Sequence, residues 1–488
     1  MRRISNCVIA LSLLTHCGSA LAVQITLTTS DAPGQTSFNT GLHWSNGQAP
    51  TSANTYVVPP GSTLRTPTSG GNLAFAGSSL TISGLSGPGG GNFEFAGSAN
   101  SVITVNNLIL DYGYITGDSA FTIAGNITLA SGGGFFDSDG NNSTLVTAPI
   151  GGSSDAYIVN PGTLVRFSAA NSYQGKTFIL DTSTLQLENA NAVQNSTIVV
   201  NDNNKLTFGS GLGTFNLGGL SGDAPIKLTD TTNNSANIKV GGNGQSTTFD
   251  GVLSGGGSLT KVGSGTLILT GANTYGTAGV TSTTVTAGTL VVNNTSGSGT
   301  GPGNVSVTGG TLGGTGTIGG TVTVNGGTLS PGNSPGVLTI GGELLMLTGT
   351  YKYEVDSTPT ATADLVNVAG NLNISSGSVT LSASDLGSSL LAMGTKCSLI
   401  DYGGSWNGGV FNGLPNYSTS LLIGSNRFAI RYDDPSGGAN FGGGSLGAGS
   451  HYVTITAVPE ASTFLIVGLG GIFAIAAVWM GKRLGINC

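Results

Sequence analysis

The first residues to examine for chemistry are two serines in a nucleophile-elbow pattern. Gly332-Asn333-Ser334-Pro335-Gly336 and Gly443-Gly444-Ser445-Leu446-Gly447 both fit G-x-S-x-G. That chemistry needs a backbone N–H from the residue after the serine, and Pro335 has none. The second motif lies in a Gly-rich stretch with no helix pattern after it. Gly314-Thr315-Gly316-Thr317-Ile318-Gly319 fits a dinucleotide fingerprint, but strand patterns continue where a helix should begin. We therefore predict no nucleophile elbow and no nucleotide site.

Carboxylates are the remaining candidates for acid–base chemistry. The acidic residues considered are Glu354, Asp356, Asp401, Asp433 and Asp434. Enzymes that cleave polysaccharides use clustered acids and bases, with Ca²⁺ in some lyases. These five residues are sparse, so solvated surface charge is the favoured interpretation and no catalytic residue is assigned.

The sequence offers few side chains that could bind a metal ion or a cofactor. His43 and His451 are far apart, and Cys397 is the one cysteine between the two ends of the chain. Asp137-Ser138-Asp139-Gly140-Asn141 offers oxygen ligands, but it breaks the EF-hand order and lacks the Glu at the twelfth position. Calcium at Asp137 and Asp139 and a simple turn both stay open, and no cofactor is predicted.

Composition and periodicity indicate the elements that would position such residues. Only 8% of the 488 residues are charged and the net charge is -7, which excludes nucleic acid as a partner. Short alternating runs rich in Val, Ile, Leu and Thr are separated by Gly, Asn, Asp and Ser turns, as at 79–82, 102–105, 121–124, 197–200 and 322–325. The sequence between the ends therefore predicts an all-β protein.

The triplet Gly-Thr-Leu recurs at 162–164, 265–267, 288–290, 310–312 and 327–329. A unit of roughly 20 residues suits one rung of a stacked solenoid, in which each rung buries its face on its neighbours. We expect the leucines to point inward, Thr and Asn at equivalent positions to form ladders, and Gly to form the corners. The predicted shape is a rod.

The N-terminus has the pattern of a secretory signal. Arg2-Arg3, an apolar run at 7–14 and the small residues Ala20 and Ala22 predict cleavage by signal peptidase before Val23.

The C-terminus combines three parts: Val458-Pro459-Glu460, the apolar segment 464–480, and Lys482-Arg483. As a helix, the segment would span roughly 25 Å, enough to cross a hydrocarbon core. The basic pair would keep the C-terminus in the cytoplasm. In this order the parts resemble a PEP-CTERM sorting tail, which implies cleavage by an exosortase and transfer to the cell surface. The alternative is a single-span anchor that is not processed.

Two segments, 261–275 and 285–293, closely resemble the autotransporter-associated β-strand repeat, also called the passenger-associated transport repeat. The first segment includes Lys261-Val262-Gly263-Ser264-Gly265 and Ala272-Asn273-Thr274-Tyr275. The stretches 327–336 and 364–368 are similar to the region that succeeds that repeat in large bacterial surface proteins, and Trp44-Ser45-Asn46-Gly47 is similar to the start of such exported proteins. The resemblance implies a right-handed parallel β-helix. No alternating strand pattern of a membrane barrel ends the chain, so we do not expect export through a barrel of its own.

These observations predict a signal peptide at 1–22, a β-rich solenoid region at 23–250, the repeat region at 251–345, a β-rich cap at 346–434, a Gly/Ser-rich linker and short strand at 435–457, and the sorting tail with its transmembrane helix at 458–488.

The favoured function is a non-catalytic surface or matrix protein for adhesion, coat formation or polysaccharide association. Its partners would be signal peptidase, an exosortase-like enzyme, envelope components and, through the helix, the membrane. The alternative is a secreted carbohydrate-active β-helix enzyme.

Overall fold

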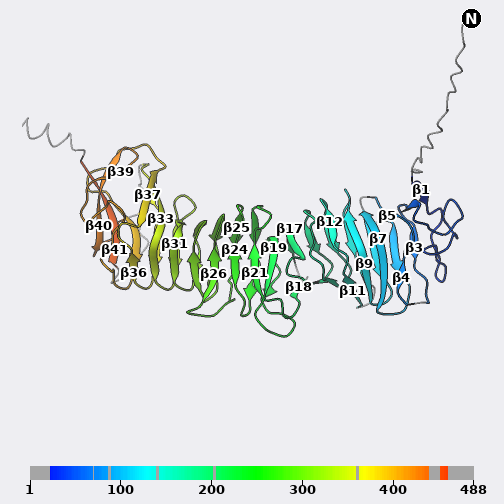
Figure 1. Cartoon of the computed structure of the whole chain (residues 1–488). Helices are drawn as coiled ribbons and strands as arrows, with labels where there is room; N and C mark the ends of the chain where they lie inside the picture. The colour runs from blue at the N-terminus through cyan, green and yellow to red at the C-terminus, as the bar shows by residue number, and fades with distance from the viewer. Residues whose placement is uncertain are drawn as a thin grey trace, which may run out of the picture.

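A computed structural model describes residues 22–69, 71–85, 90–138, 142–201, 205–358, 362–438 and 451–459. Within these ranges the regular elements are all strands, stacked along one axis into an elongated solenoid (Figure 1). The all-β prediction is confirmed, and each of the five alternating runs lies in a strand. In these same ranges we find no helix with the length and apolar character needed to cross a bilayer.

Two long sheets with almost entirely parallel strands run along the rod, because successive turns of the chain place equivalent strands side by side. The first sheet contains β1 Val23–Thr26, β2 Asn54–Val58, β4 Leu73–Ala74, β5 Ser79–Ser83, β7 Ser101–Asp111, β9 Phe121–Leu129, β11 Ser143–Val146, β12 Ile150–Gly152, β14 Leu164–Phe167, β16 Thr184–Leu187 and β18 Lys205–Phe208. β20 Ile226–Lys227 pairs separately with β23 Leu253–Ser254.

The second sheet continues to the other end of the rod. It contains β3 Thr63–Arg65, β6 Asn92–Phe95, β8 Gly113–Gly117, β10 Gly134–Phe136, β13 Ala156–Ile158, β15 Thr177–Ile179, β17 Val193–Val200, β19 Thr214–Ser221, β21 Asn237–Val240, β22 Thr247–Phe249, β24 Leu259–Lys261, β25 Thr266–Leu269, β26 Thr281–Val285, β27 Thr289–Val292, β28 Asn304–Val307, β29 Thr311–Gly314, β31 Val322–Pro331, β33 Leu344–Asp356, β34 Thr362–Ala363, β36 Leu372–Ile374 and β37 Val379–Asp385.

The repeated leucines form one column inside the rod. Leu267 pairs in register with Leu290, Leu290 with Leu312, and Leu312 with Leu329, and all four are at most 1% exposed. The prediction of inward leucines is therefore confirmed for this region.

The first Gly-Thr-Leu triplet, at 162–164, does not follow the rule. In β14 the neighbour Val165 is fully buried, whereas Leu164 is only half-buried. Because side chains alternate between the two faces of a strand, a shift of one residue in the register turns the leucine outward.

Threonine and asparagine both link neighbouring rungs, as when Thr286 Oγ1 donates to the Lys261 carbonyl at 2.9 Å. Outward threonines of β25, β27, β29 and β31 pair in register, from Thr266 and Thr289 to Thr311 and Thr328. The buried side chain of Asn273 forms hydrogen bonds to both neighbouring rungs. It accepts from the Leu253 N–H at 2.7 Å and donates to the Gly299 carbonyl at 2.6 Å. Such an amide satisfies backbone groups of two neighbouring rungs at once.

Both ends of the stack are covered. At the N-terminal end the loop that carries Phe38 and Trp44 packs these rings against Tyr56 and Phe75. At the other end lies a seven-stranded sheet in the order β30 Thr317–Ile318, β32 Val337–Ile340, β35 Leu365–Val368, β38 Lys396–Tyr402, β41 His451–Val458, β40 Asn426–Asp434 and β39 Leu421–Ile423. Its last four strands are antiparallel, so parallel stacking ends there.

Candidate binding groove

A ladder of aromatic rings stands on the outer face of the second sheet. Tyr114, Phe135, Tyr157 and Phe178 come from β8, β10, β13 and β15 and pair in register. Consecutive ring centroids are 4.4, 4.6 and 5.2 Å apart, and the ring planes are within 13° of parallel. Since each inner ring is stacked on both sides, only the outermost rings have a face without an aromatic neighbour in this ladder.

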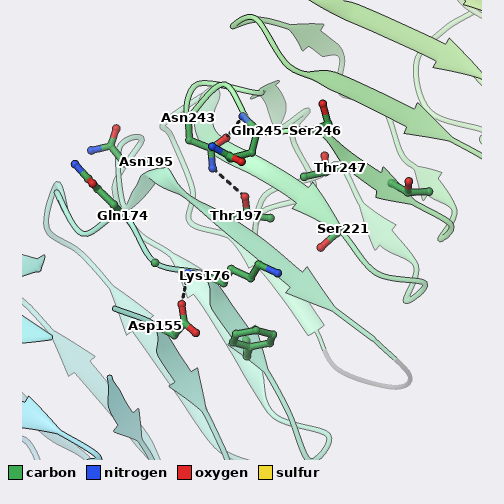
Figure 2. A pocket seen from close by; sticks show the side chains of 13 residues that line it. Asp155, Gln174, Lys176, Asn195, Thr197, Ser221, Asn243, Gln245, Ser246 and Thr247 are labelled. Atoms are coloured by element: carbon green, nitrogen blue, oxygen red, sulfur yellow. Dashed lines mark hydrogen bonds between the residues drawn. The ribbon is translucent and has the colours of Figure 1, made fainter. Parts of the chain in front are cut away.

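The column changes from large to small side chains after Phe178. The next residues along it are Val199 of β17 and Ser221 of β19, and the pairing of Gly222 with Phe249 places Thr248 of β22 beside Ser221. Less side-chain volume stands on the sheet from this point. The surface there is hollowed into a groove of about 1030 Å³ (Figure 2).

Hydroxyl and amide groups line most of the groove. The lining residues are Asp155, Gln174, Gly175, Lys176, Phe178, Asn195, Thr197, Ser221, Asn243, Gln245, Ser246, Thr247 and Thr248. Figure 2 shows Asn243 bridging to Thr197, with a distance of 2.9 Å from Nδ2 to Oγ1. Within the described part of the chain, the side-chain amides of Gln174, Asn195 and Gln245 have no hydrogen-bond partner, so they are available to a ligand.

A smaller hollow shares Asp155 with the groove. This second hollow, of about 390 Å³, is lined by Tyr112, Ser131, Gly132, Ser153, Ser154, Asp155 and Tyr157. Asp155 accepts hydrogen bonds from the Lys176 backbone N–H at 2.6 Å and from the Tyr157 hydroxyl at 3.2 Å. Burial, followed by the Asp155 charge, raises the pKa of Tyr157 to about 12, so its hydroxyl remains protonated at neutral pH.

The acidic residues singled out from the sequence do not line either hollow. Glu354 lies on β33, where its carboxylate accepts from Lys352 Nζ at 2.7 Å and from Ser334 Oγ at 2.5 Å. The hydrogen bond from Lys352, then that from Ser334, lowers the pKa of Glu354. Asp356, on the same strand, accepts a hydrogen bond from the Thr358 N–H at 3.0 Å. These contacts make a local turn and an ion pair.

Beside Glu354 lies Asp364, which the sequence did not single out as an acid. Its two oxygens accept from the Gly336 N–H at 2.9 Å and the Glu354 N–H at 3.1 Å. Burial raises the pKa of Asp364 to about 6. The loop that carries Ser334, from the first serine motif, therefore donates hydrogen bonds to two carboxylates, those of Glu354 and Asp364.

The other acids join strands of the terminal sheet. Asp433 contacts His451 Nδ1 at 2.6 Å, and Asp434 accepts from Lys396 Nζ at 2.9 Å and Thr454 Oγ1 at 2.8 Å. Burial opposes ionisation of Asp434, but these hydrogen bonds lower its pKa to about 2. Asp401 of β38 is buried in the same sheet, so the interpretation as solvated surface charge is wrong for Glu354, Asp401 and Asp434.

Among the described residues, the candidate metal ligands Asp137 and His43 have different partners in different parts of the fold. Asp137 is buried, and its carboxylate accepts hydrogen bonds from Asn160 and from Thr163 Oγ1, the latter at 3.0 Å. Asp139 and the second serine motif lie outside the described residues. His43 contacts Asp31 at 2.9 Å at the N-terminal end. In the part of the chain that the structure describes, no three His, Cys, Asp or Glu side chains are arranged to hold a metal ion.

The sorting residues lie at the two limits of the described chain. Ala22 precedes β1, and Val458 is the last residue of β41, where it pairs with Arg427. Pro459 comes directly after it and is half-buried. Ala20, Glu460, Lys482, Arg483 and the segment 464–480 lie outside the described residues.

Comparison with known proteins leaves the family open: no family model matches the chain, and no curated protein is significantly similar to it. The resemblances to the β-strand repeat and to the sorting tail therefore stay predictions.

The groove itself was missed by sequence reasoning. The available signal was the recurrence of an aromatic residue, at 114, 135, 157 and 178, at nearly constant intervals. That interval matches one rung, but it is meaningful only once the rung length is known.

Proposed function

We propose that this protein is a non-catalytic, exported envelope rod that associates with extracellular polysaccharide through the groove over β15, β17 and β22. The observation that carries the proposal is the lining of the groove. Hydroxyl and amide groups surround one aromatic ring, and Asp155 is its one carboxylate. Such side chains recognise sugar hydroxyls, whereas hydrolysis of a glycoside uses two opposed carboxyl groups.

Export and sorting are part of the same proposal. The signal at 1–22 would direct the chain out of the cytoplasm, and the tail at 458–488 would hold it in the membrane until an exosortase-like enzyme cleaves it. The resemblance of residues 261–293 to the β-strand repeat also leads us to infer a right-handed β-helix. A rod of stacked rungs then presents the groove on its side, away from its attached end.

The test combines binding and turnover on one panel of polysaccharides. Full-length protein purified in mild detergent is mixed with insoluble and soluble glycans, and bound protein, new reducing ends and unsaturated products are measured. We expect co-sedimentation with at least one glycan and no product. Reproducible cleavage that is lost when one acid is changed to Ala would replace this proposal with the carbohydrate-active enzyme.

A further inference from the structure

We infer that the groove takes an uncharged glycan chain lying along the rod axis, with one sugar ring stacked on the face of Phe178. This inference rests on the proposed association with polysaccharide and specifies its ligand and its contact residue. Three features of the molecule carry it: the aromatic ladder, the free amides and the charges of the groove.

Phe178 is the one ladder ring that borders the groove. One face is stacked on Tyr157, and the next residue in the column is Val199, which has no ring to cover the other face. Lys176 Nζ lies 6.0 Å from the ring centroid, and its exposed side chain can swing away at small cost. The C–H groups of one sugar face carry partial positive charge and suit the negative face of a phenyl ring.

The polar groups are placed for a ligand that is long in one direction. Gln174, Asn195 and Gln245 come from different rungs, and the smaller hollow continues past Asp155 toward Ser131. With rungs about 4.8 Å apart, the six intervals from the rung of Tyr112 to the rung of Thr248 give the two hollows a combined length of roughly 30 Å along the rod. Each free amide offers two donors and an acceptor, which matches neighbouring hydroxyls on a sugar chain.

The charges favour an uncharged glycan. Lys176 and Asp155 are the charged residues among those that line the groove, and they carry opposite signs. The whole chain has a net charge of -7, so a polyanionic glycan would meet repulsion without a basic cluster to offset it. Binding should therefore depend little on salt.

The experiment uses three variants of the full-length protein with soluble mixed-linkage β-glucan, galactomannan and dextran as neutral probes, and alginate as an acidic probe. Phe178→Ala removes the half-buried ring that borders the groove and should weaken binding of the best neutral probe by about tenfold or more. Phe135→Ala is the matched control, because Phe135 is stacked on both faces, and should change affinity by less than about twofold.

Val199→Phe is the second, independent arm. A phenyl ring at this position would extend the ladder by one ring and cover the face of Phe178, so it should abolish binding while the unfolding midpoint is kept. Unchanged binding by both Phe178→Ala and Val199→Phe would overturn the inference and leave the proposed function standing. Stronger binding of alginate than of every neutral probe, weakened by about 1 M NaCl, would also overturn it. Binding of none of the four probes would contradict both proposals.

Discussion

At the scale of single residues, three of the buried carboxylates in the described chain lie where strands and loops are joined. Asp364 receives two backbone N–H groups, Asp434 receives Lys396 and Thr454, and Asp31 accepts from the N–H and hydroxyl of Ser37 at 2.8 and 2.7 Å. A chain with so few charged residues places several of them inside. Their hydrogen bonds explain how these carboxylates can be buried.

The raised pKa of Asp364 makes stability depend on pH. Its pKa is about 6 in the folded protein against 3.8 for an unperturbed Asp, so the folded state binds a proton more tightly. This contribution to stability is fully present below about pH 3.8 and is lost as the pH rises through about 6. Glu354 and Lys352 are the charged groups beside it.

We predict that Asp364→Asn removes this pH dependence. The free energy of unfolding of the wild type, minus that of the variant, should be largest near pH 4 and fall by roughly 1–3 kcal/mol by pH 7. Urea denaturation at four pH values measures it. A difference that is constant between pH 4 and pH 7 would show that Asp364 is already ionised throughout.

At the scale of elements, the equivalent strands β25, β27, β29 and β31 are held in register by one column of inward-pointing side chains. Leu267, Leu290, Leu312 and Leu329 contact one another through consecutive rungs, and Tyr351 of β33 continues the register. A leucine in such a column packs against neighbours above and below as well as across the rod. Its loss therefore leaves a cavity that backbone movement in one rung cannot close.

We predict that Leu290→Ala destabilises the protein by about 2–5 kcal/mol. Val291→Ala is the matched control, because Val291 is the next residue of β27 and points outward. It should cost less than about 1 kcal/mol. The measurement is urea denaturation followed by circular dichroism. Equal losses for the two variants would mean that the leucine column is not the main core of these rungs.

At the scale of the whole molecule, covered ends keep the solenoid from adding further strands. The aromatic cluster around Trp44 closes one end, and the antiparallel strands β38, β41 and β40 close the other. β41 lies between its two neighbours, so the strand that leads to the tail is part of the terminal sheet. Exposed sheet edges otherwise promote association between chains.

We predict that the surface-localised form lacks the apolar segment 464–480 because it is cleaved near Pro459-Glu460. An apolar helix of this length holds a protein in the bilayer essentially irreversibly, so recovery without detergent requires its removal. Changing Pro459 and Glu460 together should keep the chain in the membrane fraction. Intact mass of the extracted protein is the measurement. A surface form that still carries residues 461–488 would establish a permanent anchor.

The sequence by itself determined the strand class and the inward column of the repeat region, because both depend on local rules. Alternation has a period of two residues, and Gly-Thr-Leu recurs at close to one rung, so Leu290 and Leu312 were predictable. The ladder from Tyr114 to Phe178, the groove beyond it and the outward turn of Leu164 required the tertiary structure. Which outward residues of neighbouring rungs stand side by side depends on the exact number of residues in each intervening turn, and a change of one residue reverses the face.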